Sequence, residues 1–230
     1  PRKSGKGYTC RCPAHEDRGP SLSVTEAIAS IEAGPRGPQV AAYFDLDGTL
    51  VAGYTGNSFF TDRLRNRDVP ASEFIRTVVT AVDGTVLGGD PTAVAYTNFS
   101  GLAGRDEDFM VELGERLFHD KLAATIRPEA RELVRAHQRM GHTLAVASAA
   151  TRYQIAPIAR DLGIEHLVCT ELEVVDGIFT GKTVGDMLWG KFKAKGARKF
   201  AKAHEVDLAS SYAYGNGYED VAFLSTVGNP

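Results

Sequence analysis

The sequence predicts an α/β protein built on a parallel sheet, with a helical insertion after the first strand of that sheet. Short apolar runs at 40–44 and 143–147 predict buried strands. An amphipathic segment at 128–140 precedes the second run and ends at a glycine, as helices commonly do. Asp176-Gly177 between β-branched residues predicts a hairpin after the second strand. Strands that alternate with helices in this way favour an α/β domain.

The composition fits one α/β domain with an inserted subdomain. The chain has 230 residues, is 43% hydrophobic and carries a formal net charge of −3, which gives no general attraction to nucleic acid. No apolar run approaches the length needed to span a bilayer, and no signal peptide is visible. Its three cysteines, Cys10, Cys12 and Cys169, are too few and too scattered for a disulfide framework. We therefore expect a cytoplasmic protein.

The most informative stretch is 40–51, where the apolar run ends in Asp45 and Asp47, followed by Gly48 and Thr49. Two carboxylates so close together repel each other, and a bound divalent cation would offset that repulsion. Mg²⁺ is commonly held by one or two carboxylates together with a substrate phosphate. Gly48 permits a tight turn, and the Thr49 hydroxyl can hydrogen-bond back across it. The alternative is a strand followed by an Asx-type turn.

Two further polar residues occupy positions suited to binding a phosphoryl group. Ser148 follows the run at 143–147, and open α/β sheets bind ligands at the carboxyl ends of their strands. A basic run at 191–203 predicts a helix, with Lys193 as the phosphate-neutralising cation and Lys191 as the alternative. The other lysines of this run are expected to form a solvated face.

A last strand at 210–214 leads into an acidic loop and then into an apolar helix at 222–227. The loop carries Asn216, Glu219 and Asp220. Asn216 offers a neutral carbonyl oxygen, which binds Mg²⁺ more weakly than a carboxylate does. The neighbouring acids leave enough negative charge for a cation site shared with Asp45.

These stretches together resemble the four motifs of the haloacid dehalogenase (HAD) superfamily, in the correct order. Asp45-Leu46-Asp47-Gly48-Thr49-Leu50 is similar to the first motif, Ser148 to the second, Gly190-x-x-Lys193 to the third and 215–220 to the fourth. The resemblance covers roughly residues 38–230 and is closest to subfamily IB, the phosphoserine-phosphatase-like branch. That branch carries aspartate where this chain has Asn216, which puts metal affinity and turnover in doubt.

The resemblance implies a Rossmann-like core at 38–52 and 127–230, with a helical C1-type cap at 53–126. Helical patterns fill the cap segment, at 57–67, 71–82, 92–99 and 107–124. Such a cap closes over the phosphate site and excludes water during phosphoryl transfer.

The resemblance also implies a Mg²⁺-dependent phosphomonoester hydrolase that works through an aspartyl-phosphate. Asp45 would attack phosphorus, and Asp47 would protonate the leaving oxygen and then activate water. The other implied roles are phosphoryl contacts from Ser148 and Lys193, substrate contacts from Gly48, Thr49, Ala149 and Arg152, and metal ligation by Asp45, Asp47, Asn216 and Asp220. Asn216 motivates a second hypothesis, a weakly active or non-catalytic binding or regulatory module.

The substrate is expected to be a small or lipid-like phosphate ester. Phosphoserine-specific relatives carry a glutamate soon after the first motif, whereas this chain has no acid between 52 and Asp62. Tyr54, Phe59 and Phe60 suit an apolar leaving group, although paired aromatics more commonly pack in a core. Some relatives are fused to acyltransferases, which makes an acyltransferase a candidate fusion partner or associate. The sequence does not indicate an oligomeric state.

Residues 1–37 are polar and contain glycine and proline throughout. The stretch 8–24 weakly resembles half of a DNA-primase zinc ribbon, with Cys12 and His15 as two candidate ligands and Cys10 as a third. This motivates a third hypothesis, a nucleic-acid-associated protein with a partial zinc module. A structural zinc site normally needs four ligands, so we favour a disordered or loosely docked tail without metal.

Overall fold

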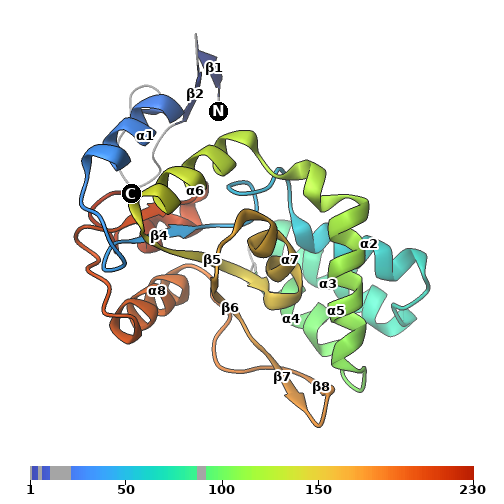
Figure 1. Cartoon of the computed structure of the whole chain (residues 1–230). Coiled ribbons are helices and arrows are strands. Elements are labelled where there is room, and N and C mark those ends of the chain that lie inside the picture. Colours follow the sequence, from blue (N-terminus) through green and yellow to red (C-terminus); the bar gives the residue numbers. More distant parts are fainter. Residues whose placement is uncertain (1, 5–6, 11–21, 87–91) are drawn as a thin grey trace.

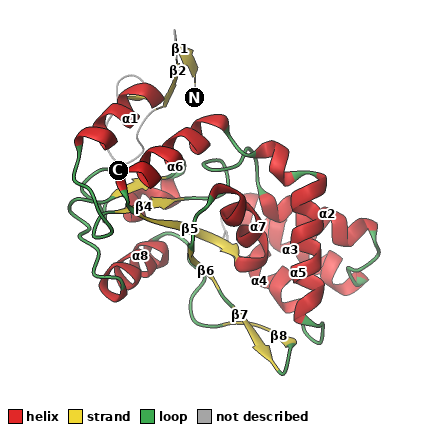
Figure 2. Cartoon of the chain, viewed as in Figure 1, coloured by secondary structure: helices red, strands yellow, loops and turns green. Residues whose placement is uncertain are grey.

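The protein is a three-layered α/β structure in which helices cover both faces of a parallel sheet (Figures 1 and 2). The computed structural model describes residues 2–4, 7–10, 22–86 and 92–230. The central sheet has the strand order β6-β5-β4-β9, and all neighbouring strands are parallel. Its strands are β4 (Ala41–Phe44), β5 (Thr143–Thr151), β6 (His166–Thr170) and β9 (Tyr212–Tyr214).

Strand β4 is buried on both faces, as expected for a central strand of a parallel sheet. Ala41 and Tyr43 pack in one apolar cluster, with side chains of α8 (Lys191–Ala203) and α9 (Val221–Leu224). Ala42 and Phe44 pack in the other cluster, with side chains of α6 (Pro128–Met140) and α7 (Arg152–Leu162). Successive side chains of β4 point to opposite faces of the sheet, so this one strand packs against the helices on both sides.

The order of the strands brings the predicted motifs together. From β4 the chain proceeds outward through β5 to β6 on one side, then returns to place β9 on the other side of β4. The carboxyl ends of β4 and β9 are level with each other and with Val146 of β5, since Phe44 pairs with Val146 and with Tyr214, while β5 continues beyond them to Thr151. A reversal of strand order of this kind opens a crevice where α/β proteins bind ligands.

The segment between β4 and α6 is helical, as the sequence predicts, and its helices gather at one end of the sheet (Figure 1). They are α2 (Thr55–Arg65), α3 (Ala71–Val86), α4 (Ala93–Ser100), α5 (Glu107–Asp120) and the short 3₁₀ turn η1 (Leu122–Thr125). The division of the chain into a core and a cap remains a prediction. Among the described residues, no helix has both the length and the apolar character required to cross a bilayer.

Local turn signals in the sequence are confirmed. Helix α6 ends at Gly141, whose φ of 71° is left-handed, a conformation that glycine adopts without strain. Asp176 and Gly177 both have positive φ and join β7 (Leu172–Val175) to β8 (Ile178–Thr183) in an antiparallel ribbon. The last predicted helix, 222–227, is shorter than expected and follows the 3₁₀ turn η2 (Tyr218–Asp220).

The prediction that residues 1–37 form a disordered tail is wrong for their described part. Helix α1 (Val24–Ala33) packs against α6, and short antiparallel strands precede it: β1 (Arg2–Ser4), β2 (Gly7–Cys10) and β3 (Leu22–Ser23). Ile31 is buried in the main core, and Glu32 forms an ion pair with Arg139 of α6 at 2.6 Å. The candidate zinc ligands Cys12 and His15, and the Cys10 side chain, lie outside what the structure describes.

A chain of buried polar side chains links α6 to the end of β9. His142 Nε2 lies 2.9 Å from the carbonyl oxygen of Pro35, so it must carry the proton and donate. When His142 is neutral, its Nδ1 accepts from His137 Nδ1–H at 2.8 Å, and His137 Nε2 accepts from the Tyr214 hydroxyl at 2.8 Å. Every ring nitrogen in the chain then has a partner with both imidazoles neutral, and burial favours this uncharged state.

This histidine chain predicts a loss of stability in mild acid. Burial, with a contribution from His142, lowers the pKa of His137 to about 3, and burial also lowers the pKa of His142. The unfolded protein therefore binds more protons below about pH 6.5, so stability is full above that pH and falls as the pH drops. Proton uptake by His137 in the unfolded chain should alone lower the free energy of unfolding by about 2 kcal/mol between pH 7 and pH 5. Urea unfolding at the two pH values measures this difference.

The matched variants are His137→Gln and His119→Gln, because His119 is exposed. His137→Gln should flatten the dependence of the unfolding free energy on pH by about one proton, whereas His119→Gln should leave it unchanged. A wild-type free energy that is equal at the two pH values would contradict the assignment of neutral imidazoles.

Candidate active site

The candidate site is a small cavity of about 70 Å³ at the carboxyl ends of β4 and β5, beside the first turn of α8. Six residues singled out in the sequence line it: Asp45, Asp47, Ser148, Ala149, Lys193 and Asp220. They come from segments that are separated by up to 175 residues in the chain, from Asp45 to Asp220. The topology described above is what brings them to one place.

Lys193 is the centre of the site. Its Nζ donates to Asp45 Oδ1 and to Asp220 Oδ1, each at 2.6 Å, and all three side chains are buried. Lys193 lies in the first turn of α8, and side chains in a helix lean toward its N-terminus, which directs this one into the cavity. Lys191, the alternative cation, is exposed, as are the neighbouring lysines Lys195 and Lys199.

Burial and the neighbouring charges shift the pKa values of Asp45 and Lys193. Burial raises the pKa of Asp45 to about 6, against an opposing effect of Lys193 and with a further rise from Asp220. Burial acts to lower the pKa of Lys193, but Asp45 and Asp220 outweigh it and raise that pKa. At neutral pH the site therefore holds an ionised Asp45 carboxylate beside an ionised ammonium group.

Asp47 has a different environment from Asp45. Its Oδ1 accepts a hydrogen bond of 2.7 Å from the backbone N–H of Thr55, the first residue of α2. Burial raises the pKa of Asp47, while the bonds from Thr55 oppose the rise. Thr55 Oγ1 in turn accepts from Gln154 of α7 at 3.1 Å, and Gln154 also caps the start of α7 with Thr151. Asp47 is thus tied to the inserted helices rather than to Lys193.

The turn after β4 is closed by main-chain hydrogen bonds rather than by Thr49. Gly48 N–H donates to Val51 and Leu50 N–H donates to Asp45. The expectation that the Thr49 hydroxyl fixes the turn is wrong, since Thr49 Oγ1 is buried with no hydrogen-bond partner among the described residues. Gly48 and Thr49 do not line the cavity.

Asn216 lies against this turn and is tied to Asp220. Its backbone N–H donates to Asp220 Oδ2 at 3.2 Å, so both oxygens of Asp220 have partners. A Cβ atom built on Gly48 would overlap the Asn216 side-chain amide. Asn216 therefore sits next to the aspartate loop, although it does not line the cavity itself.

The close approach of Gly48 to Asn216 predicts a larger effect of an added methyl group at Gly48 than at Gly53. Gly48 and Gly53 both have positive φ, 83° and 87°, but a Cβ atom at Gly53 would meet nothing within 4 Å. Gly53→Ala should cost about 1 kcal/mol of stability through backbone strain. Gly48→Ala should cost about 1–2 kcal/mol, because it also displaces the amide of Asn216, an exposed residue that can move aside. Equal losses in thermal or urea unfolding would show that the packing against Asn216 does not matter.

Arg152 does not contact this cavity, so the prediction that it binds the substrate here is not supported by its placement. It is the first residue of α7, pairs with Glu171 at 3.0 Å and lines a separate, larger cavity. Ser148 is buried in β5, which continues beyond it to Thr151 through an irregularity in the pairing. Its Oγ accepts from Ala150 N–H at 3.2 Å.

Two residues that line the cavity, Leu188 and Trp189, are not singled out by the sequence. Gly190, Glu219 and Tyr54, which the sequence does indicate, line it as well, and Tyr54 exposes 66% of its surface. Thr170 is buried behind them and holds two parts of the wall together. Its hydroxyl donates to the Ala149 carbonyl at 2.7 Å and accepts from Leu188 N–H at 3.1 Å. A threonine at the end of a strand gives no distinct signal in one sequence.

The predicted metal ligands supply oxygen donors around the cavity. The described residues contain no group of three or more histidine, cysteine, aspartate or glutamate side chains arranged to bind a metal ion. Two carboxylates, Asp45 and Asp220, do converge, and the Asp47 main-chain carbonyl and the Asn216 amide belong to the adjoining loops. This set contains only oxygen donors, which fits a hard cation such as Mg²⁺.

Comparison with known proteins agrees with the fold and the order of the motifs. A family model described as haloacid dehalogenase-like hydrolase matches residues 42–225. A phosphoserine phosphatase of Mycobacterium tuberculosis is 33% identical over 197 residues, which are 82% of this chain and 62% of that relative. This chain therefore spans less than two thirds of the length of that relative.

Solved structures share the architecture. A crystal structure of a protein of unknown function from Bordetella pertussis Tohama I superposes with a TM-score of 0.73 at 25% identity, covering 83% of this chain and 88% of the other. A phosphoserine phosphatase solved as an analogue of its phospho-aspartyl intermediate has a TM-score of 0.58 at 21% identity, covering 85% and 84%. At 21% identity, the similarity to this phosphoserine phosphatase shows a shared fold and no more.

Proposed function

Because this chain belongs to the haloacid dehalogenase-like hydrolases, we propose that it is a phosphomonoester hydrolase that requires Mg²⁺ and works through an aspartyl-phosphate on Asp45. The observation that carries the proposal is the buried Asp45 carboxylate, held at 2.6 Å by Lys193 in a cavity that also contains Asp47 and Ser148. Phosphoryl transfer depends mainly on positioning and charge, and this arrangement supplies both.

The two aspartates have environments suited to different roles. Asp45 is ionised at neutral pH and presents a nucleophilic oxygen, while Lys193 offsets negative charge on the incoming phosphoryl group. Asp47 has a raised pKa, so it is better able to hold a proton for the leaving oxygen and later to accept one from water. A pair of carboxylates with unequal environments is a common basis for such a division of roles.

Four groups would hold the metal: the carboxylates of Asp45 and Asp220, the main-chain carbonyl of Asp47 and the amide oxygen of Asn216. Mg²⁺, when bound, would offset the negative charge of the transferring phosphoryl group. Ser148 Oγ and Lys193 Nζ would hold phosphoryl oxygens.

The wall of the cavity supports a substrate with an apolar or aromatic leaving group. Tyr54, Leu188 and Trp189 line it, and Phe59, a second candidate from the sequence, is instead buried in the core. We therefore place aryl and lipid-like phosphates ahead of phosphoserine. Phosphoserine stays in the test, because the curated relative of Mycobacterium tuberculosis is named a phosphoserine phosphatase.

The test is release of inorganic phosphate from a panel of phosphoserine, aryl, nucleotide and lipid phosphomonoesters, with Mg²⁺ or with EDTA. The proposal predicts release that stops in EDTA and returns when Mg²⁺ is added in excess. Release that is unaffected by EDTA would contradict the metal requirement, and no release from any ester would contradict the hydrolase.

Asn216 favours one alternative, a binding or regulatory module that turns over slowly. Asn216→Asp would add a carboxylate beside Asp220, whose Oδ2 already accepts from the backbone of residue 216. If the natural site is weakened by its neutral amide, this variant should raise the rate at limiting Mg²⁺ by about tenfold or more. An unchanged or lower rate would mean that the natural amide does not weaken the site, leaving the hydrolase as the better reading.

A further inference from the structure

Gln154 joins the start of its own helix, α7, to the start of α2. Its Oε1 accepts from the backbone N–H of Thr151 at 2.9 Å and from the Thr151 hydroxyl at 3.0 Å. A backbone N–H can only donate, so this end of the Gln154 amide must be the oxygen. The Nε2 end therefore faces Thr55, the first residue of α2, and donates to its Oγ1 at 3.1 Å. The capping of α7 thus fixes which end of Gln154 meets Thr55.

Thr55 carries this hydrogen-bond direction on to Asp47. A hydroxyl has one hydrogen, and because Gln154 already donates to Thr55 Oγ1, that hydrogen remains available for an acceptor. The acceptor is the Asp47 carboxylate, which bonds with the Thr55 side chain and accepts from the Thr55 backbone N–H at 2.7 Å through Oδ1. Thr55 and Thr151 are both buried, which strengthens these hydrogen bonds.

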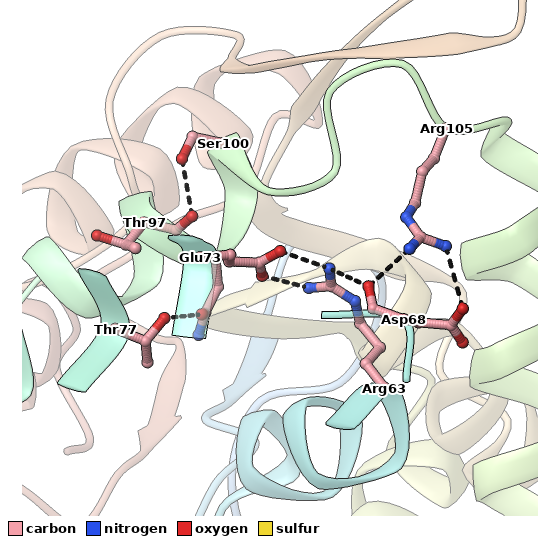
Figure 3. Close-up of polar contacts among 8 residues, drawn as sticks. Arg63, Asp68, Glu73, Thr77, Thr97, Ser100 and Arg105 are labelled. Atoms are coloured by element: carbon pink, nitrogen blue, oxygen red, sulfur yellow. Dashed lines mark hydrogen bonds and ion pairs between the residues drawn. The ribbon is translucent and has the colours of Figure 1, made fainter. Parts of the chain in front are cut away.

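The other end of α2 holds Thr55 in place. Arg63, near the end of this helix, donates to both Glu73 oxygens of α3 at 2.9 and 3.0 Å (Figure 3). Both of these side chains are buried, and separating a buried ion pair is strongly unfavourable. Helix α2 is therefore fixed at both ends, and Asp47 takes its orientation from Thr55.

These contacts decide which oxygen of Asp47 can carry a proton. A proton on Oδ1 would face the Thr55 N–H, so a protonated Asp47 carries it on Oδ2. Asp47 lines the same cavity as Asp45. In the proposed reaction, an Asp45 oxygen forms a bond to phosphorus while the bond from phosphorus to the ester oxygen breaks. The Asp47 proton goes to that departing oxygen.

We propose that Gln154 is a positioning residue that acts through Thr55 to orient the proton of Asp47 toward the departing ester oxygen. The inference rests on the proposed role of Asp47 as the proton donor. An ester with a strongly basic leaving oxygen, such as an alkyl or phenyl phosphate, needs this proton, whereas nitrophenolate departs as an anion. Gln154 therefore supports the hydrolysis of unactivated phosphate esters.

The test uses Gln154→Glu, which keeps the size of the side chain and replaces its NH₂ donor by an acceptor. The Thr55 hydrogen then turns to the new carboxylate and away from Asp47. Phenyl phosphate and p-nitrophenyl phosphate share a ring but differ in leaving group. The variant should lower kcat/KM about tenfold for phenyl phosphate and by less than about twofold for p-nitrophenyl phosphate. A merely structural loss would lower both values alike.

The matched control is Gln138→Glu. Gln138 of α6 supports the other end of α7, where its Nε2 donates to the carbonyls of Leu162 and Gly163 at 3.0 and 3.2 Å. The same chemical change there should leave the ratio of the two kcat/KM values as it is in the wild type. Thr55→Val removes the hydroxyl but keeps the backbone N–H, and it should change the ratio in the same direction as Gln154→Glu.

A second measurement needs neither activity nor metal. Gln154→Glu, Asp47→Asn and the double variant are compared with the wild type in thermal unfolding. The new carboxylate repels Asp47 and takes away its hydroxyl donor, so Gln154→Glu should cost less when residue 47 is asparagine. The double variant should therefore lose less melting temperature than the sum of the two single losses. Gln138→Glu with Asp47→Asn should be additive, because these residues share no partner.

Two results would overturn the proposal. The first is a wild type that hydrolyses both esters and a Gln154→Glu variant whose kcat/KM falls equally for both or for neither, which leaves the hydrolase intact. The second is additive losses of melting temperature in Gln154→Glu and Asp47→Asn. If the wild type releases no phosphate from any ester, the proposed hydrolase is wrong, and the melting temperatures still decide whether Gln154 acts on Asp47.

Discussion

Replacing Asp45 by asparagine is expected to lower the rate of phosphate release about a thousandfold or more. The amide keeps the shape of the side chain but cannot act as a nucleophile on phosphorus. Lys193 retains Asp220 as an ion-pair partner at 2.6 Å, so the fold should persist. Steady-state assays with the best substrate of the panel, together with thermal unfolding, measure both effects.

The matched control is Asp207→Asn, because Asp207 lies on the surface and its carboxylate accepts only local hydrogen bonds, from Ala209 N–H and the Ser210 hydroxyl. It should leave the rate unchanged. A rate for Asp45→Asn within about tenfold of the wild type would exclude Asp45 as the nucleophile, since loss of a group that forms the covalent bond cannot be so mild.

Replacing Lys193 by methionine is expected to destabilise the protein by about 3–5 kcal/mol at neutral pH. Lys193 is the ion-pair partner of the buried Asp45 and Asp220, and without it two carboxylates face each other with no counterion. The same change should abolish phosphate release. Lys195→Met is the matched control, since Lys195 is on the same helix and 78% of its side chain is exposed.

The loss of stability caused by Lys193→Met should become smaller as the pH falls. Without the ammonium group the pKa of Asp45 rises further, so the folded variant binds more protons than the unfolded chain in mild acid. Its stability therefore increases as the pH falls through that raised pKa toward the ordinary value of an aspartate. Urea unfolding that shows the same loss at every pH would contradict this account of the buried charges.

Much of the fold is predictable because its signals are local. Helix α6 has its bounds where the sequence predicts them, at Pro128–Met140, because proline favours the first turn and glycine favours the end. The Asp176-Gly177 turn is likewise specified by two residues that tolerate positive φ. Asp45, Lys193 and Asp220 are predictable because each lies at the end or the start of a regular element. Ser148 is expected directly after a strand but lies within β5, which continues to Thr151.

The remainder depends on contacts between distant segments. Helix α1 was missed because Ile31 is stabilised by packing against α6, more than a hundred residues away. The link from Asp47 through Thr55 to Gln154 crosses three elements and leaves no mark in any one of them. The periodicity of α3 predicts a helix, but only the partners of Glu73 reveal that its polar side faces inward.

The central claim, that Asp45 forms a covalent phosphoryl intermediate, is tested most directly by trapping that intermediate. The enzyme is quenched during turnover with Mg²⁺, then reduced with borohydride, which converts an aspartyl-phosphate to homoserine, and its peptides are analysed by mass spectrometry. The account predicts homoserine at position 45 only in samples that received substrate. Unmodified Asp45 in an enzyme that releases phosphate, or homoserine at Asp47 instead, would contradict it.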